Sequence, residues 1–271
     1  MAIITVSRQI GSFGDEIAKA TADRLGYEYV EQFQISKILS SLGFSVSDID
    51  DYDEKKPSIW QTLTMQKEIF AHYIQAAVYE LAARKDVVIV GRGGQVILKS
   101  IPGTLHVRII APYATRLSRL QEDRGYDEKI AQRIIRQKDR DSEGYLSTYF
   151  YADWNNCDLY DLVINTRAMT VEESVDIITG AAGSEKIKEN TRTSEELFDL
   201  ALSHRGNAAI LEVAGKTEWV DLAVEKGVAQ LTGFVRSVEL KKDCEKAISD
   251  IRGIKSVANQ LGVRDGSKQI F

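Results

Sequence analysis

Short apolar runs alternate with long amphipathic stretches through the first two thirds of this 271-residue chain. The apolar runs favour buried β-strands, and the longer stretches favour helices. The predicted strands are Ile3–Ser7, Val87–Val90, Leu105–Ile110 and Leu162–Asn165. The predicted helices are Asp15–Leu25, Trp60–Arg84, Tyr113–Arg124, Glu128–Lys138 and Val171–Thr179. Strands that alternate with helices of this length predict an α/β fold in which a parallel sheet is flanked by helices.

The pattern changes near Gly180, where a glycine-rich turn and a polar segment predict a domain boundary. The elements predicted beyond it are a helix, two strands, a helix and a last strand, at Ser194–Ser203, Ala208–Val213, Val228–Thr232, Lys241–Ile251 and Ser256–Leu261. We therefore expect a first domain at residues 1–183, a linker at 184–193 and a small α+β domain at 194–265.

Composition narrows the classes of protein. A content of 44% apolar residues is enough for a sizeable core, and the net charge of −5 argues against a nucleic-acid-coating protein. Two cysteines give neither a disulfide framework nor a cysteine-rich zinc site, and they fit a cytoplasmic location. No apolar run approaches the ~18 residues of a membrane span, so we expect no transmembrane segment.

A strand, a glycine-containing turn and a helix follow one another at Ser7–Glu16. In this layout the backbone N–H groups of the turn and the helix N-terminus face an anion, so a phosphate site is predicted. Its predicted phosphate-binding residues are Gly11, Ser12, Phe13 and Gly14. The segment is not a Walker A motif, because the Gly-Lys-Ser/Thr ending is absent, and an ordinary βα turn is the alternative interpretation.

Arginines mark the other candidate positions. Arg92 follows a buried strand, at the sheet edge where open α/β folds bind ligands, although an exposed turn residue would fit equally. Arg133, Arg136 and Arg140 are spaced i, i+3 and i+7 and therefore share one helix face, and Arg116 lies on the preceding helix. Acidic residues in the same helices leave a salt-bridged, exposed face as the alternative.

The segment Ile4–Gly26 resembles the opening of bacterial cytidylate kinases, which are P-loop nucleoside monophosphate kinases. It resembles more closely the cytidylate kinase-like family, which opens with Ser-Arg, Gly-Ser-x-Gly and a helix. In this resemblance Gly14 takes the place of the phosphate-binding lysine and Asp15 that of the magnesium-binding serine. Arg8 is the predicted substitute for the lysine, and Asp15 requires a cation between itself and the phosphates.

Further segments carry the resemblance to about residue 180. Gly91–Gly94 resembles the Gly-Arg-Asp turn with which cytidylate kinases hold the acceptor, with Gly93 at the aspartate position. Lys37 falls where those kinases place an arginine near the acceptor phosphate. Ile110–Asp141 resembles their lid, in which arginines close over the phosphates. The resemblance implies that Arg92, Gly93 and Lys37 bind the acceptor.

The C-terminal segment Val228–Leu261 resembles a BON domain, a small module typified by a Val-x-Leu-x-Gly-x-Val hairpin, a helix and Gly-Val-x-x-Val-x-Asn. BON domains are associated with phospholipid surfaces or regulatory ligands, so this resemblance implies a regulatory ligand, a lipid surface or a partner protein. A plain structural appendage is the alternative interpretation.

Two functions follow from these patterns. The first is a kinase that transfers the γ-phosphate of ATP, with Mg²⁺, to a pyrimidine nucleoside monophosphate such as CMP. In it, the predicted catalytic residues are Arg8, Arg133, Arg136 and Arg140, and the loop residues with Asp15 and Arg116 bind ATP. The second is a nucleotide-binding regulator that has lost turnover and signals through the BON-like domain.

Overall fold

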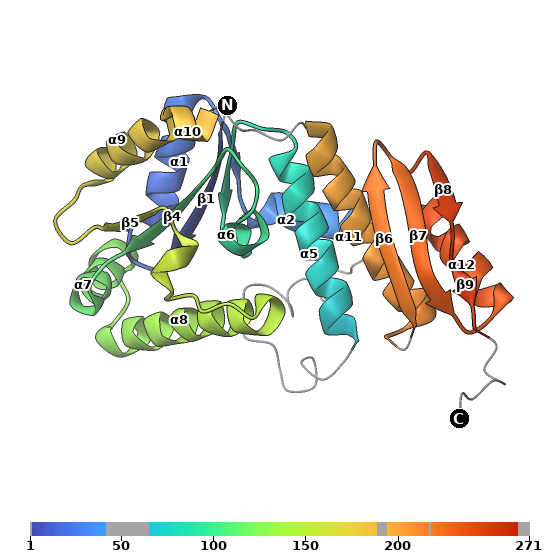
Figure 1. The fold of residues 1–271 in the computed structure, drawn as a ribbon. Helices are drawn as coiled ribbons and strands as arrows, with labels where there is room; N and C mark the ends of the chain where they lie inside the picture. The colour runs from blue at the N-terminus through green and yellow to red at the C-terminus, as the bar shows by residue number, and fades with distance from the viewer. Residues whose placement is uncertain (1, 42–64, 189–193, 217, 265–271) are drawn as a thin grey trace. The chain divides into compact units, whose positions relative to one another are not determined.

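The computed structural model describes residues 2–41, 65–188, 194–216 and 218–264 (Figure 1). The chain divides into two compact units, and each is described by itself. Unit 1 consists of Met1–Ser58 and Arg84–Arg192, and unit 2 of Ile59–Ala83 and Thr193–Phe271.

Unit 1 contains a five-stranded parallel sheet in the order β2-β3-β1-β4-β5. The strands are β1 (Ile3–Arg8), β2 (Glu28–Val30), β3 (Val87–Val90), β4 (Thr104–Ile110) and β5 (Leu162–Asn165). The helices are α1 (Gly14–Leu25), α2 (Gln32–Ser41), α6 (Gly94–Ile97), α7 (Tyr113–Arg124), α8 (Glu128–Phe150), α9 (Val171–Ala182) and α10 (Glu185–Lys188), with a 3-10 turn at Cys157–Leu159. The predicted α/β fold with its parallel sheet is confirmed.

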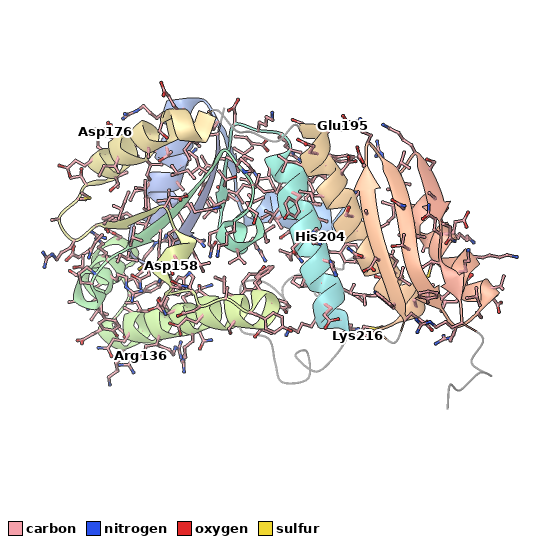
Figure 2. All side chains as sticks on the ribbon, in the orientation of Figure 1. Arg136, Asp158, Asp176, Glu195, His204 and Lys216 are labelled. Atoms are coloured by element: carbon pink, nitrogen blue, oxygen red, sulfur yellow. The ribbon has the colours of Figure 1, made fainter. Side chains whose placement is uncertain are left out.

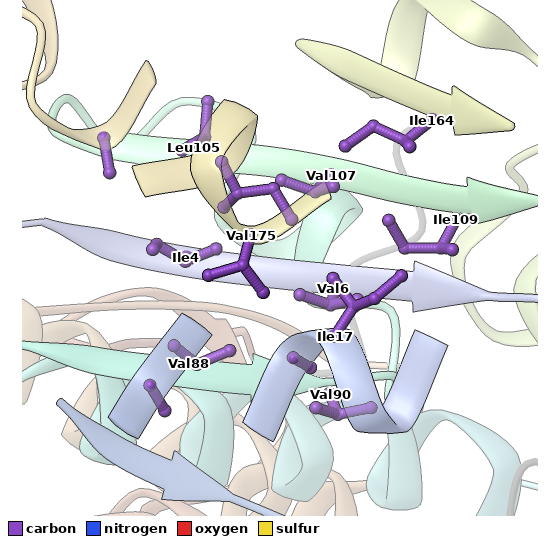
Figure 3. Packing of buried hydrophobic residues seen from close by; sticks show 14 residues of the cluster. Ile4, Val6, Ile17, Val88, Val90, Leu105, Val107, Ile109, Ile164 and Val175 are labelled. Atoms are coloured by element: carbon purple, nitrogen blue, oxygen red, sulfur yellow. The ribbon is translucent and has the colours of Figure 1, made fainter. Parts of the chain in front are cut away.

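The two faces of this sheet differ because side chains alternate along a strand. Ile4 and Val6 of β1 pack with Val107 of β4 against α1 and α9, which form the apolar core (Figure 3). The alternate residues Thr5 and Ser7 carry hydroxyls on the opposite face, where the Thr5 hydroxyl bonds His106 Nδ1 at 2.8 Å. One face therefore carries the apolar core. The other, here called the polar face, mixes buried apolar residues such as Ile3 and Ile89 with buried polar side chains.

The described residues of unit 2 form a small sheet and three helices. Its strands β6 (Trp219–Glu225), β7 (Val228–Val235), β8 (Ser256–Asn259) and β9 (Gly262–Val263) join through antiparallel β6–β7 and parallel β7–β8 and β7–β9 pairs. Its helices are α5 (Gln66–Ala82), α11 (Ser194–Ala214) and α12 (Val238–Ser249). Helix α11 packs against α5, α12 and β6.

One predicted element of unit 2 is wrong. Ala208–Val213 is not a strand but the last part of α11, which continues through Gly206. Gly206 does not end the helix; it lets α11 pack closely on β6 and α12, since a Cβ there would collide with the Leu222 side chain and lie 3.1 Å from Ile248 Cδ1. Tertiary packing therefore explains the glycine in the interior of this helix.

Helix α5 lies between two strands of the unit 1 sheet in sequence but packs within unit 2. The compact units are therefore not consecutive segments of the chain, unlike the expected division into 1–183 and 194–265. Part of the expected linker forms α10 (Glu185–Lys188), and residues 189–193 lie outside the described residues, as does the start of the helix predicted at Trp60–Arg84.

Candidate active site

The loop between β1 and α1, Gln9–Phe13, has the backbone shape of an anion cradle. Gly11 and Phe13 have φ of 74° and 61°, and Phe13 is the N-cap of α1. The buried Ser12 hydroxyl closes the turn by donating to the Gln9 carbonyl at 2.7 Å. Because the first N–H groups of a helix have no intrahelical acceptor, the start of α1 offers donors and a positive dipole end to an anion.

Arg8 lies directly over Gly14. A Cβ at Gly14 would stand 2.7 Å from Arg8 Cγ, so the side chain of Arg8 occupies the space that any residue but glycine would need. Arg8 Nε then donates to Asp15 Oδ1 at 2.8 Å, while the Arg8 side chain is 28% exposed. The guanidinium thus lies beside Asp15 in the first turn of α1, and Asp15 partly neutralises its charge.

Arg116 and Arg119 of α7 have different partners. Arg116 is buried, and its Nη1 and Nη2 donate to the two carboxylate oxygens of Asp139 on α8 at 2.9 and 2.8 Å. Its backbone carbonyl would be 3.0 Å from a Cβ on Gly11, so the helix passes close over the loop. The guanidinium of Arg116, which we predicted to bind ATP, therefore ties α7 to α8 in this structure.

Arg119 holds the loop instead, and the sequence analysis did not select it as a site residue. Its guanidinium stacks 4.0 Å from the Phe13 ring centroid, and Nη1 donates to the Gly11 carbonyl at 3.1 Å. Nη2 donates to the carbonyl of Thr166, just after β5, at 2.6 Å. Burial lowers the pKa of Arg119. Its i+3 spacing from Arg116 was the available signal, since it places both residues on one side of α7.

The structure does not bring the three predicted catalytic arginines of α8 to the loop. Arg133, Arg136 and Arg140 are exposed, on the side of the helix opposite the buried Ala131 and Ile135. In Figure 2 the Arg136 side chain points away from the sheet. Their predicted role at the phosphates has no support from the geometry of this conformation.

The loop, α7 and α8 enclose a pocket of about 380 Å³. Its charged lining residues are Asp15, Glu16, Asp123, Arg119, Arg124 and Lys138. Within the described part of the chain, no three or more His, Cys, Asp or Glu side chains are grouped to hold a metal ion. A cation here would therefore share its oxygen ligands between the acids of the first turn of α1 and a bound phosphate chain.

The acceptor-side candidates lie in different environments. Arg92, with φ of 56°, is 1% exposed, whereas Lys37 is exposed on α2. A Cβ on Gly93 would lie 2.7 Å from the Phe150 ring, and Gly93 itself has φ of 72°. Phe150 therefore fills the space that an aspartate at this position would require.

Comparisons with known proteins agree with this geometry. The model of the cytidylate kinase-like family matches residues 3–168. A cytidylate kinase from Archaeoglobus fulgidus is 26% identical over 186 residues, which are 68% of this chain and 97% of the relative. A uronate isomerase from Corynebacterium glutamicum is 35% identical over 91 residues, but these are only 18% of its length and 34% of this chain.

One solved structure supports the fold. It is an uncharacterized protein from Eubacterium ventriosum, 23% identical, with a TM-score of 0.53, and the match covers 68% of this chain and all of the other. Among the helices that the structure describes, none has the length and apolar character needed to cross a membrane.

Proposed function

The chain belongs to the cytidylate kinase-like family, and from this premise we propose that it transfers the γ-phosphate of ATP to a nucleoside monophosphate, a pyrimidine nucleotide such as CMP. The observation that carries the proposal is the position of Arg8 over Gly14. Cytidylate kinases have a phosphate-binding lysine at the position of Gly14, and in this chain Arg8 supplies a cation at the N-terminus of α1 instead. Full-length cytidylate kinase relatives support the kinase-like role.

In this proposal the ATP phosphates lie on the loop and the first turn of α1. Arg119 keeps the loop in its left-handed conformation through Gly11 and Phe13, so the N–H donors are preorganised before the nucleotide arrives. When ATP binds, Arg8 leaves Asp15 for the phosphate chain. Several phosphate oxygens can then accept charge-assisted hydrogen bonds from its guanidinium, and together these are stronger than its bond to the single Asp15 oxygen. No general base is needed, because the acceptor phosphate is already a nucleophile at neutral pH.

Mg²⁺ fits the donor set of this site. It prefers carboxylate and phosphate oxygens, and the Asp15 carboxylate, 61% exposed at the start of α1, is free to turn once Arg8 moves. Asp15 and Glu16 would hold the ion, which would neutralise charge on the transferred phosphate. This role satisfies the requirement for a cation between Asp15 and the phosphates.

The test is an ADP-release assay with ATP, Mg²⁺ and a panel of CMP, dCMP, UMP and other monophosphates. We expect at least one acceptor to stimulate ADP release, and Arg8→Gln to lower kcat roughly 10²-fold or more. Arg24→Gln, which removes an exposed arginine of α1 far from its N-terminus, is the matched control. ATP binding by calorimetry without ADP release for any acceptor would refute the enzyme.

That negative result would favour the second candidate, a nucleotide-binding regulator without turnover. Two observations support it: Asp15 already neutralises Arg8, and unit 2 carries an open groove of about 520 Å³ lined by Lys242, Lys246 and Lys255. Such a groove suits an anionic regulatory ligand. In this reading the BON-like segment senses that ligand, a lipid surface or a partner protein.

A further inference from the structure

Arg108 of β4 is buried on the polar face of the unit 1 sheet, with 5% of its surface exposed. Its guanidinium lies between two aromatic rings, 4.4 Å from the Trp154 centroid and 5.3 Å from that of Tyr160. Nη1 donates to the Tyr160 hydroxyl at 3.3 Å, and Nη2 donates to Asn155 Oδ1 at 2.8 Å. All of these partners are neutral.

No carboxylate of the described residues forms an ion pair with Arg108. The buried Arg116, in contrast, is paired with Asp139, and the partly buried Arg205 is paired with Glu80. An arginine cannot lose its proton in a protein, so burying it without a counter-ion is costly. Cation–π contacts recover part of this cost. The unbalanced charge is the feature that a bound anion would satisfy.

An open groove of about 710 Å³ is lined by two of the residues that contact Arg108, Trp154 and Asn155. The C-terminal half of α8 and residues 151–155 form this lining. Asn155 is exposed, and its amide links Arg108 to Glu143: Oδ1 accepts from Arg108, and Nδ2 donates to Glu143 Oε1 at 2.9 Å. The charged residues of the lining are Arg140, Glu143 and Asp153.

The groove also lies close to the donor loop. Arg108 pairs in register with Ser7, the residue before Arg8, and Ser7 Oγ accepts from Trp154 Nε1 at 2.8 Å. A group bound at Arg108 is therefore one strand away from the start of the phosphate-binding loop. This edge of the sheet, at the carboxyl ends of its strands, is where open α/β folds hold ligands.

We propose that Arg108 binds the phosphate monoester of the acceptor, which enters the groove and replaces Asn155 Oδ1 on the guanidinium. A dianionic phosphate accepts two parallel N–H bonds from arginine, whereas the neutral amide accepts one. The inference rests on the proposed kinase function for the identity of the acceptor. The unbalanced charge of Arg108 supports anion binding independently of turnover.

The decisive variant shifts one carboxylate from position 143 to position 155 and leaves the net charge of the protein unchanged. Glu143→Gln combined with Asn155→Asp places a carboxylate directly against Arg108, so its charge is already balanced. We expect acceptor affinity to weaken at least tenfold, with the KM for ATP unchanged and thermal stability equal or higher. Glu143→Gln alone is the control and should retain acceptor affinity.

Two measurements separate the inference from the proposed function. Calorimetry with CMP, UMP, AMP, GMP and inorganic phosphate measures binding, and ADP release measures turnover. Weaker monophosphate binding in the double variant, with or without turnover in the wild type, supports the role of Arg108. Unchanged binding in the double variant, or a wild type that binds no phosphate compound outside the ATP pocket, overturns it.

Arg108→Met provides a second test, with a control for loss of an arginine elsewhere in the chain. The control is Arg205→Met with Glu80→Gln, which removes a partly buried ion pair from unit 2. We expect monophosphates to raise the melting temperature of the wild type and of the control, but not of Arg108→Met. An equal ligand-induced rise in Arg108→Met would exclude phosphate binding at this residue.

Discussion

Gly14 and Arg8 occupy adjoining space at the N-terminus of α1. This explains why glycine stands at position 14, where the resemblance to cytidylate kinases leads one to expect a lysine. A lysine at position 14 would need a Cβ where the stem of Arg8 already lies. The loop therefore admits a cation from position 8 or from position 14, but not from both. The resemblance to the family could show that the lysine is missing, but only the structure could show why glycine is required at position 14.

This exclusion makes a prediction about exchanging the two residues. Gly14→Lys alone should displace Arg8, break its bond to Asp15 and weaken ATP binding. Adding Arg8→Ala removes the collision, so the double variant should bind ATP more tightly than Arg8→Ala alone, by about tenfold if one charge-assisted bond is regained. Calorimetry with ATP measures the three affinities, and a double variant no better than Arg8→Ala would contradict the shared space.

The spacing of the arginines along the sequence predicted which of them share a helix face, but it did not predict which groups their guanidinium groups bind. Arg116 and Arg119 are one turn apart, yet the partly buried Asp139 pairs with the first and the loop carbonyls accept from the second. Which acid the next helix brings near decides these partners, and periodicity does not contain that information. Arg108 was missed for the same reason, since a strand arginine has no spacing signal, and only its burial with no counter-ion among the described residues singles it out.

At the scale of elements, α8 shows what periodicity can decide. The prediction that Arg133, Arg136 and Arg140 share one face agrees with the structure, in which all three are exposed. The face that meets α7 is instead the apolar one of Ala131 and Ile135, which packs with Leu120. Weighing the apolar positions of α8 before its charges would have placed the arginines on the solvent side.

Helices α5 and α11 meet through a histidine pair that gives unit 2 a pH dependence. His72 Nδ1 and His204 Nδ1 are 2.9 Å apart, and Tyr79 stacks on His204. One ring must donate and the other accept, so the accepting ring must be neutral and the pair cannot take up a proton on both rings. Burial and the neighbouring His72 lower the pKa of His204 to about 4, and burial lowers that of His72 although Glu68 opposes the shift.

Because folding holds the pKa of His204 below its ordinary value, the unfolded chain binds more protons in this range. Stability is therefore fully present above pH 6.5 and falls as the pH approaches about 4. The loss from His204 amounts to roughly 3 kcal/mol at most. Hydrogen exchange of α5 and α11 amides between these pH values measures it.

His204→Gln supplies the control for this pH dependence, since an amide bonds His72 without titrating. We expect the variant to show a flatter loss of protection in α5 and α11 on acidification. His106 of unit 1, whose pKa burial also lowers, should leave the exchange of unit 2 unchanged when it is replaced by Asn. An unaltered slope in His204→Gln would mean that the pair does not govern the acid response.

At the scale of the whole molecule, the structure differs most from the sequence-based prediction in the unit to which α5 belongs. Strand and helix alternation predicted β1, β3, β4 and β5 of unit 1, because each is a short apolar run between turns, but it missed the short and partly polar β2 (Glu28–Val30). The same alternation assigned α5 to the first domain, since it lies between β2 and β3 in sequence. Its pairing with α11 depends on contacts across more than a hundred positions, such as Tyr73 with Glu212 at 3.3 Å, which no local pattern encodes.

A truncation tests this arrangement at the scale of the molecule. A chain that ends at residue 192 retains all of unit 1 and α5 but lacks α11. His72, Tyr73 and Tyr79 of α5 then lose the helix that covers them, and Glu80 loses Arg205. We expect this chain to bind more of a hydrophobic dye, to associate on size-exclusion chromatography and to melt at a lower temperature than the full chain.

A chain that ends at Arg264 is the matched control, because it keeps every strand of unit 2 through β9. It should melt within a few degrees of the full chain, since a change of 1 kcal/mol moves the midpoint by roughly 2–4 °C in a chain of this size. A monomeric 1–192 chain with full-length stability would show that α5 does not need α11. The expected result instead shows that α5, which precedes β3 (Val87–Val90) in the chain, requires α11 as its cover within unit 2.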